Sequence, residues 1–293
     1  HSLPHGAMTG QQMAAIEKIL IKEKPDWVLV YGDTNSTLAG ALAASKLRIP
    51  VAHVEAGLRS FNRRMPEEIN RILTDHISKS LFAPTKIAVD NLQNEGVQKQ
   101  FVHLVGDVMY DAVLNYSKQV EKNIDLLDRF NIEPKNYILA TIHRQENTDD
   151  KEKLKNIFSA LAEAPKLVVF PIHPRTKKIL DKYNIKINGQ IIPIDPVGYL
   201  DMILLEKNAY KIATDSGGVQ KEAYFHGVPC LTLRNETEWV ELVKAGVNHL
   251  VGADKNKILE VLNTKESDFK NQLLYGDGFA AKKIINGLIK DTS

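Results

Sequence analysis

Carboxylates that could exchange protons with a substrate follow two apolar runs in the first part of the sequence. Asp33 comes after residues 28–31, and Glu55 comes directly after residues 51–54. If these runs are parallel strands, their carboxyl ends meet at the sheet edge where ligands bind. Each residue also has a structural interpretation, because Asp33 could cap a helix and Glu55 could pair with Arg59 in a structural ion pair.

Further acidic and imidazole side chains stand at the ends of predicted elements. Glu67 and Glu68 follow Pro66, and negative residues are favoured in the first turn of a helix, so the pair taken alone needs no chemical role. His143 and His173 each follow an apolar run, where a parallel sheet places its ligand-binding residues. An ordinary histidine at a strand end is the alternative explanation for His143.

A turn suited to a phosphate group stands later in the chain. Ser216, Gly217 and Gly218 lie between an apolar run and a helical pattern. Small residues there leave backbone N–H groups exposed at the positive end of a helix dipole, which favours an anion. Glu222 lies one to two turns into the same helix and could accept hydrogen bonds from a ribose diol. A plain helix start and a surface glutamate are the simpler alternatives.

An alternation of helical patterns and apolar runs must position these side chains. The helical pattern at residues 11–24 is followed by the run at 27–31, and the same order continues through the first third of the chain. A second series begins at residue 137 after a charged segment at 118–136. Runs without polar alternation indicate parallel strands covered on both faces. We therefore predict an α/β fold with two Rossmann-like domains that face a cleft.

Composition narrows the possible partners. The chain has 293 residues with 38 Lys and Arg against 36 Asp and Glu, so no global field attracts nucleic acid or an anionic membrane. No apolar stretch reaches the roughly 18 residues of a membrane span. The single cysteine, Cys230, stands in an apolar run and leaves no disulfide within the chain, which fits a reducing cytosol. We expect a cytoplasmic protein.

Six motifs occur in a fixed order along the chain. They are Gly32-Asp-Thr34, His53-Val-Glu-Ala-Gly-Leu-Arg59, Pro66-Glu-Glu-Ile-Asn-Arg71, His143-Arg-Gln-Glu-Asn147, Thr214-Asp-Ser-Gly-Gly-Val-Gln-Lys-Glu222 and Tyr275-Gly-Asp-Gly278. Together they resemble the motifs of the non-hydrolysing UDP-N-acetylglucosamine 2-epimerase family. The resemblance spans nearly the whole chain and is much more specific for the family than for the exact sugar.

The resemblance implies the glycosyltransferase-B architecture and assigns roles to matching positions. It places an N-terminal domain at residues 1–118, completed by a final helix within 278–293, and a UDP-binding domain at 119–277. A homodimer is usual in the family, and no metal or redox cofactor is implied. The residues expected to be catalytic are Asp33, Glu55, Glu67 and His143. Those expected to bind the UDP-sugar are Arg59, Arg144, His173, Ser216, Gly217, Gly218 and Glu222.

The residue types suit the family's chemistry. The C2 proton of an amino sugar is weakly acidic because no carbonyl is attached there. The resemblance implies anti elimination of UDP across C1 and C2 to a 2-acetamidoglycal, followed by protonation of C2 from the opposite face and return of UDP. This requires acid–base groups on both sides of C2 and stabilisation of the departing diphosphate.

Two departures from the family pattern leave alternatives open. The usual opening strand and Gly-Thr-Arg-Pro-Glu turn are absent, so we expect an N-terminally truncated first domain. Thr237-Glu-Trp-Val-Glu241 stands where many members have Thr-Glu-Arg-Pro-Glu, which is closer to the branch that makes surface-polysaccharide sugars. In that branch Arg63 and Arg64 could hold the carboxylate of UDP-2,3-diacetamido-glucuronate. A glycosyltransferase of the same architecture and a non-catalytic sugar-nucleotide-binding module are the competing functions.

Overall fold

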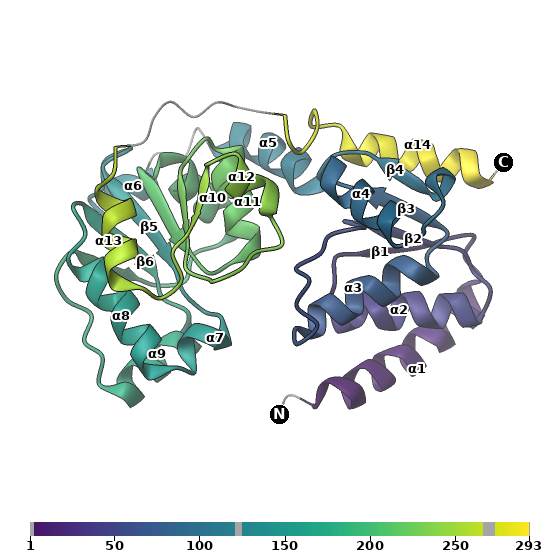
Figure 1. The fold of residues 1–293 in the computed structure, drawn as a ribbon, viewed down its shortest axis with the longest axis horizontal. Helices are drawn as coiled ribbons and strands as arrows, with labels where there is room; N and C mark the ends of the chain where they lie inside the picture. Colours follow the sequence, from purple (N-terminus) through teal and green to yellow (C-terminus); the bar gives the residue numbers. More distant parts are fainter. Residues whose placement is uncertain (1–2, 121–124, 266–272, 293) are drawn as a thin grey trace. The chain divides into compact units, whose positions relative to one another are not determined.

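The computed structural model describes residues 3–120, 125–265 and 273–292 (Figure 1). The chain divides into two compact α/β units. Unit 1 consists of residues 1–111 and 273–293, and unit 2 consists of residues 112–272. These limits stand a few residues from the boundaries expected after residues 118 and 277. Both sheets are wholly parallel, as the uninterrupted apolar runs predicted.

Unit 1 contains a four-stranded parallel sheet in the order β1-β2-β3-β4. Because the strands follow the chain in order, the residues after β1 and β2 come from neighbouring strand ends. The strands are β1 (Val28–Tyr31), β2 (Val51–Val54), β3 (Ser80–Ala83) and β4 (Val102–Leu104). The helices are α1 (His5–Glu23), α2 (Asn35–Lys46), α3 (Pro66–Ile77), α4 (Lys86–Asn94), the short 3-10 helix η1 (Lys99–Phe101), the start of α5 (Val108–Val120) and α14 (Ala280–Thr292).

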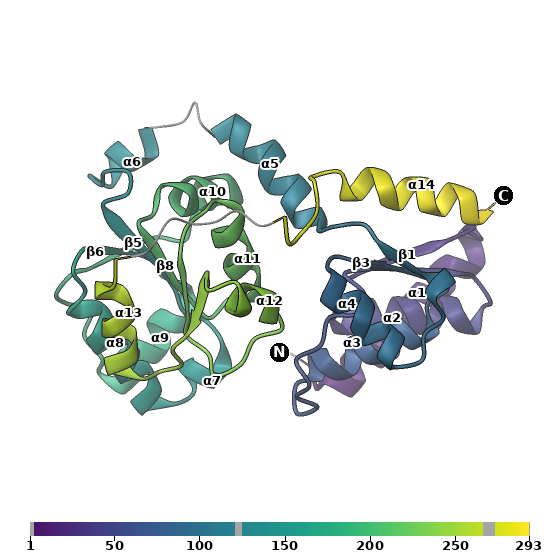
Figure 2. The same ribbon diagram turned by 45° about the horizontal axis from the view of Figure 1, so that its top comes forward.

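Apolar side chains cover both faces of this sheet. Leu20 of α1 and Ala41 and Ala44 of α2 pack with Val30 and Val51 on one face. Ile284 of α14 packs with Phe82 on the opposite face. Figures 1 and 2 show α14 along one side of the unit 1 sheet and α1 and α2 along the other. Helix α14 thus packs within unit 1, although it follows unit 2 in the sequence.

Unit 2 contains a six-stranded parallel sheet in the order β10-β9-β8-β5-β6-β7. The order changes direction between β5 and β8, and ligands bind at such a switch point in open α/β sheets. The strands are β5 (Tyr137–Thr141), β6 (Leu167–Pro171), β7 (Ile191–Ile194), β8 (Lys211–Thr214), β9 (Cys230–Thr232) and β10 (Asn248–Leu250). The helices are α6 (Asp125–Arg129), α7 (Gln145–Thr148), α8 (Lys151–Ala162), α9 (Pro174–Tyr183), α10 (Tyr199–Asn208), α11 (Gly217–Phe225), α12 (Val240–Lys244) and α13 (Lys255–Asn263).

The two faces of the unit 2 sheet have separate cores. Leu154 and Phe158 of α8 pack with Phe170 on one face, and Ile203 of α10 and Ala223 of α11 pack on the other. Strand β10 was not predicted, since it has only three residues and its side chains include an asparagine and a histidine. None of the helices within the described ranges is both long and apolar enough to cross a membrane.

Gly57, in the turn after β2, is expected to tolerate no side chain. Its φ is +82°, and a Cβ there would lie 2.3 Å from the Ala88 carbonyl oxygen. We predict that Gly57→Ala lowers the free energy of unfolding by about 2–5 kcal/mol through left-handed strain and overpacking. Gly96→Ala is the control, because its φ is +86° with open space around it, and strain alone costs about 1–2 kcal/mol. Equal losses in urea unfolding would contradict the packing argument.

Candidate functional site

Asp33 stands at the end of β1 and is held by helix α3. A guanidinium nitrogen of Arg71 donates to its carboxylate, and the Asn70 side chain donates to its backbone oxygen at 2.9 Å. The cap of α2 is Thr34, whose hydroxyl accepts from the Thr37 backbone N–H at 3.4 Å. Asp33 therefore is not the cap, and its side chain keeps 31% of its surface exposed.

Glu55 stands at the end of β2 in a strained conformation. Its φ is +68°, a region that costs a non-glycine residue about 1–3 kcal/mol and that clusters at functional sites. A Cβ built on Gly32 would lie 3.4 Å from the Glu55 carboxylate. The Glu55 carboxylate thus lies beside the residue that precedes Asp33. The structure brings these two predicted carboxylate positions to one edge of the unit 1 sheet.

A buried carboxylate, that of Asp75 on α3, connects these strand ends. One oxygen lies 2.7 Å from Nδ1 of His53, in the middle of β2. The other accepts from the Gly57 backbone N–H at 3.1 Å and from Arg59 at 2.7 Å. Both side chains of the His53–Asp75 pair are fully buried. Neither was selected as a site residue from the sequence.

Burial and neighbouring charges act in opposite directions on the pKa values of His53 and Asp75. Burial lowers the pKa of His53, but the charge and hydrogen bond of Asp75, with the Gly32 carbonyl and Glu55, raise it above its usual 6.5. Burial raises the pKa of Asp75, yet His53 and Arg59 together hold it below its usual value. Each partner therefore favours the charged form of the other, and removal of one partner would leave an uncompensated charge inside the protein.

Arg59, predicted as a substrate-binding residue, has buried structural partners. Its side chain is 1% exposed, and its guanidinium donates to both oxygens of Glu95 at 2.7 Å and to Asp75 at 2.7 Å. A third contact reaches the Leu58 carbonyl at 2.6 Å. The partner suggested from the sequence, Glu55, is not among these contacts. We therefore reassign Arg59 to the support of the β2 turn.

Glu67 and Glu68 differ in how far their side chains are buried. Glu68 is 1% exposed and accepts from the Ser60 and Phe61 backbone N–H groups at 2.9 Å each. Arg71 donates to Glu68 at 2.7 Å while also contacting Asp33. Glu67 is half-buried in the first turn of α3. Glu68 therefore anchors the loop before the helix, and Glu67 is the more accessible carboxylate of the two.

Asp215 has a comparable role in unit 2. It follows β8, is fully buried, and accepts from the backbone N–H groups of His143 at 3.1 Å and Arg144 at 3.0 Å. The Asn147 side chain donates to it at 3.1 Å and to the Leu233 carbonyl at 3.0 Å. These bonds fix the residues after β5 beside those after β8. The structure thus brings His143, Arg144 and Ser216 to the switch point of the sheet.

The His143 side chain remains accessible at this edge. Its ring is 48% exposed, with Nδ1 3.3 Å from an Asp215 oxygen. Arg144 is 29% exposed, and its guanidinium lies 3.9 Å from Glu238. Contact of Nδ1 with a buried carboxylate orients the ring and leaves Nε2 for another group. Both side chains can therefore reach an anion bound at this edge.

The Ser216-Gly217-Gly218 turn begins α11 as predicted. The Ser216 hydroxyl accepts from the Val219 backbone N–H at 3.4 Å. A Cβ on Gly217 would lie 2.5 Å from a Glu238 oxygen, so any side chain there would displace that carboxylate. Glu238 is itself held by Arg234 at 3.0 Å. The sequence did not predict Glu238 at this position.

Glu222 is buried, which excludes the simple surface interpretation. It is 6% exposed on α11. Burial first, and then Glu222 through its charge and a hydrogen bond, raises the pKa of Tyr199 well above its usual value. Burial and the Glu222 charge together raise the pKa of fully buried Glu206. Glu222 thus lies in an acidic and aromatic environment with Tyr199 as a partner.

His173 has a structural contact of its own. It caps α9, with Nδ1 accepting from the Arg175 backbone N–H at 3.2 Å. Strand β6, which precedes it, pairs directly with β5, so His173 stands at the edge next to His143. The ring is exposed, and the cap fixes its position.

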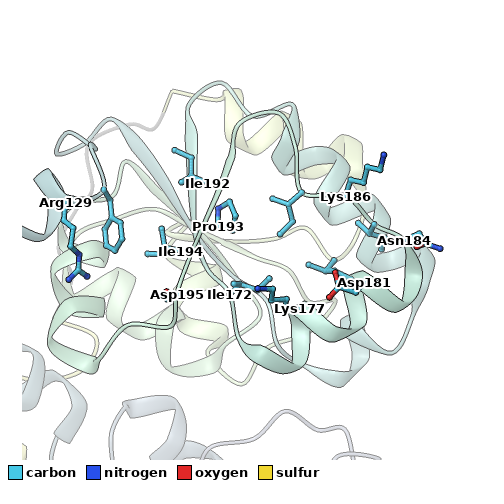
Figure 3. Close-up of a pocket in the computed structure, with 14 residues that line it drawn as sticks. Arg129, Ile172, Lys177, Asp181, Asn184, Lys186, Ile192, Pro193, Ile194 and Asp195 are labelled. Atoms are coloured by element: carbon cyan, nitrogen blue, oxygen red, sulfur yellow. The ribbon is translucent and has the colours of Figure 1, made fainter.

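A pocket of about 1080 Å³ lies elsewhere in unit 2 (Figure 3). It runs along the edge strand β7, with Arg129 towards one end and Lys186 towards the other. None of the predicted site residues is among its 14 lining residues. Within the described ranges, no group of three or more His, Cys, Asp or Glu side chains could hold a metal ion.

Comparisons with known proteins match this chain to sugar-nucleotide 2-epimerases. The family model described as UDP-N-acetylglucosamine 2-epimerase matches residues 1–289. A Methanococcus maripaludis protein named UDP-N-acetylglucosamine 2-epimerase homolog is 58% identical over 291 residues, covering 97% of this chain and 81% of its own. The UDP-2,3-diacetamido-2,3-dideoxy-D-glucuronate 2-epimerase of Pseudomonas aeruginosa is 51% identical over 299 residues, covering 99% and 82%.

A solved structure gives the same result for the fold. The Methanocaldococcus jannaschii UDP-GlcNAc 2-epimerase, crystallised in complex with UDP-GlcNAc and UDP, aligns with a TM-score of 0.90 and 51% identity. The alignment covers 99% of this chain and 82% of that chain. The α/β fold and the family resemblance predicted from the sequence are thereby confirmed.

The ion pair of His53 makes the stability of the protein depend on pH. Because the folded pKa of His53 is above 6.5, its contribution is complete below that pH and is lost as the pH rises through the folded pKa. We expect the unfolding free energy of the wild type, relative to His53→Gln, to fall as the pH rises above 6.5 and through the raised pKa of folded His53. Urea unfolding of both proteins measures this difference. A difference that stays constant or grows would contradict a charged His53.

Proposed function

The chain belongs to the UDP-N-acetylglucosamine 2-epimerase family, and we propose that it inverts C2 of UDP-N-acetylglucosamine to give UDP-N-acetylmannosamine. The observation that carries the proposal is the pair of carboxylates, Asp33 and Glu55, at neighbouring strand ends of unit 1. Unit 2 offers the complementary element, a glycine turn at a helix N-terminus beside His143 and Arg144. Proton transfer and diphosphate binding are the two requirements of the reaction.

The proposed reaction proceeds by elimination and re-addition. A carboxylate removes the C2 proton while the bond from C1 to the diphosphate oxygen breaks, so the electrons of the C–H bond form the double bond between C1 and C2. UDP leaves as an anion. An acid then protonates C2 from the opposite face, and UDP re-forms its bond to C1. Each positioned acid–base group contributes roughly 10²–10⁴-fold to such a step.

Three carboxylates of unit 1 are the proposed acid–base groups. Asp33 is oriented by Arg71, Glu55 is fixed by its strained backbone, and Glu67 is accessible in the first turn of α3. His143 is the proposed fourth catalytic group, beside the departing diphosphate.

Unit 2 is the proposed nucleotide-binding half. Ser216, Gly217 and Gly218 would bind the diphosphate through backbone N–H groups at the start of α11. Arg144 would add a bidentate cation, and His173 would stand at the adjacent strand end. Glu222, held beside Tyr199, would accept hydrogen bonds from the ribose hydroxyls. These assignments rest on residues that follow β5, β6 and β8 and on Glu222 within α11.

A second substrate, UDP-2,3-diacetamido-glucuronate, is favoured by one comparison. The Pseudomonas aeruginosa enzyme with that name is 51% identical to this chain. Arg63 and Arg64 are exposed in the loop before α3 and could pair with the additional carboxylate of that sugar. A homodimer, usual in the family, and a cytoplasmic location, consistent with a lone buried Cys230, complete the proposal.

Solvent exchange at C2 tests the reaction and the substrate together. The protein is incubated in D2O with UDP-N-acetylglucosamine and, separately, with UDP-2,3-diacetamido-glucuronate, and the C2 proton is followed by NMR. We expect deuterium at C2 and the appearance of the C2 epimer with the first substrate. Turnover of only the second would select the alternative. UDP binding without exchange of either would contradict an epimerase.

Substitutions in each unit test the role proposed for its residues. Asp33→Asn and Glu55→Gln should each lower kcat by roughly 10²–10⁴-fold with UDP affinity unchanged, whereas Glu222→Ala should mainly weaken UDP binding. Asp90→Asn, which alters an exposed carboxylate of unit 1 paired with Lys86, is the matched control. Wild-type rates in Asp33→Asn or Glu55→Gln would refute the acid–base assignment.

A further inference from the structure

His53 contacts two elements that carry proposed catalytic residues. Its ring lies in the middle of β2 and is fully buried. Nδ1 is 2.7 Å from Asp75 of α3, and Nε2 is 2.8 Å from the Gly32 carbonyl at the end of β1. Gly32 directly precedes Asp33, and Glu55 follows His53 by two residues. One imidazole ring therefore connects β1, β2 and α3.

The geometry requires a hydrogen on both ring nitrogens. The Gly32 carbonyl oxygen can only accept, so Nε2 donates to it. The Asp75 carboxylate pairs with the Arg59 guanidinium at 2.7 Å, and Arg59 and His53 hold the pKa of Asp75 below its usual value. Asp75 is therefore an anion, and Nδ1 donates as well. An imidazole that donates through both nitrogens is a cation. The raised pKa of His53 agrees with this assignment.

Two acidic groups are electrostatic neighbours of the ring. Asp75 and Glu55 are the acidic groups that act on His53, and Arg59 contacts Asp75 from the other side. The ring therefore interacts with one of the proposed catalytic carboxylates as well as with the buried carboxylate that supports the β2 turn.

We propose that His53, with Asp75, is a positioning residue for C2 inversion. It sets the spacing between the β1 end that carries Asp33 and the β2 turn that carries Glu55. Asp75 completes the link because it binds Gly57, two residues after Glu55. This inference rests on the proposed function. A shift of about 1 Å in such groups can cost on the order of 100-fold in rate.

Two isosteric substitutions break the link at different points. In His53→Asn the amide nitrogen stands near the former Nδ1 and keeps the bond to Asp75, while the bond to Gly32 is lost. In His53→Gln the amide nitrogen reaches towards the former Nε2 and keeps the bond to Gly32, while the bond to Asp75 is lost. Both remove the cation. His103→Gln on β4, whose ring stacks on Phe82 at 5.3 Å, is the matched control.

The experiment measures C2 exchange of UDP-N-acetylglucosamine, UDP affinity and thermal unfolding for the wild type and the three variants. We expect each His53 variant to lower kcat on the order of 100-fold, with KM and UDP affinity unchanged. His103→Gln should retain the wild-type kcat and KM. A residue that only stabilises the fold would not lower kcat at unchanged KM in a variant that remains folded.

Three outcomes would overturn the inference. A folded His53 variant with the wild-type kcat would remove the positioning role while the proposed function stands. An inactive wild type would refute the proposed function and this inference with it. Nitrogen NMR of histidine-labelled wild type at about pH 7 tests the ring directly, and a ring with one unprotonated nitrogen would refute the cation even if neither variant folds.

Discussion

The buried carboxylate of Asp75 is the interaction on which the edge of unit 1 depends. It lies among three donors, the His53 ring, the Gly57 backbone and Arg59. An unpaired charge there would cost several kcal/mol. The three donors are therefore held in contact with the carboxylate. Through them it joins the end of β1 to the turn after β2, and Glu95 extends the network to the end of α4. The exposed carboxylates at this edge are positioned by a buried one.

Unit 2 also has a buried aspartate that fixes the loops after its strands. Asp215 is buried after β8 and accepts hydrogen bonds from backbone N–H groups of the residues after β5. In both units a parallel sheet brings strand ends together, and a buried aspartate then fixes the loops that follow. The accessible side chains differ in chemistry, since unit 1 presents carboxylates and unit 2 presents His143, Arg144 and a glycine turn. This division matches a reaction that needs proton transfer and release of a diphosphate.

The sequence predicted the elements well because their signals are local. Apolar runs gave nine of the strands, and the motifs at their ends located Asp33, Glu55 and Ser216. The partners could not be predicted, because they depend on contacts between distant segments. Arg59 pairs with Asp75 and Glu95 rather than with nearby Glu55. The burial of Glu68 beside the accessible Glu67 depends on such contacts as well. The spacing of Glu68, Arg71 and Asp75, three and then four residues apart on α3, was the available signal for one supporting face.

The central claim, that C2 inversion proceeds through cleavage of the bond between C1 and the diphosphate, can be tested by positional isotope exchange. UDP-N-acetylglucosamine is prepared with oxygen-18 in the position that bridges C1 and the β-phosphorus, and phosphorus NMR follows the label during turnover. The account predicts that the label spreads to the non-bridging oxygens of the β-phosphate while C2 exchanges its hydrogen. Inversion at C2 with the label confined to the bridge would contradict the account.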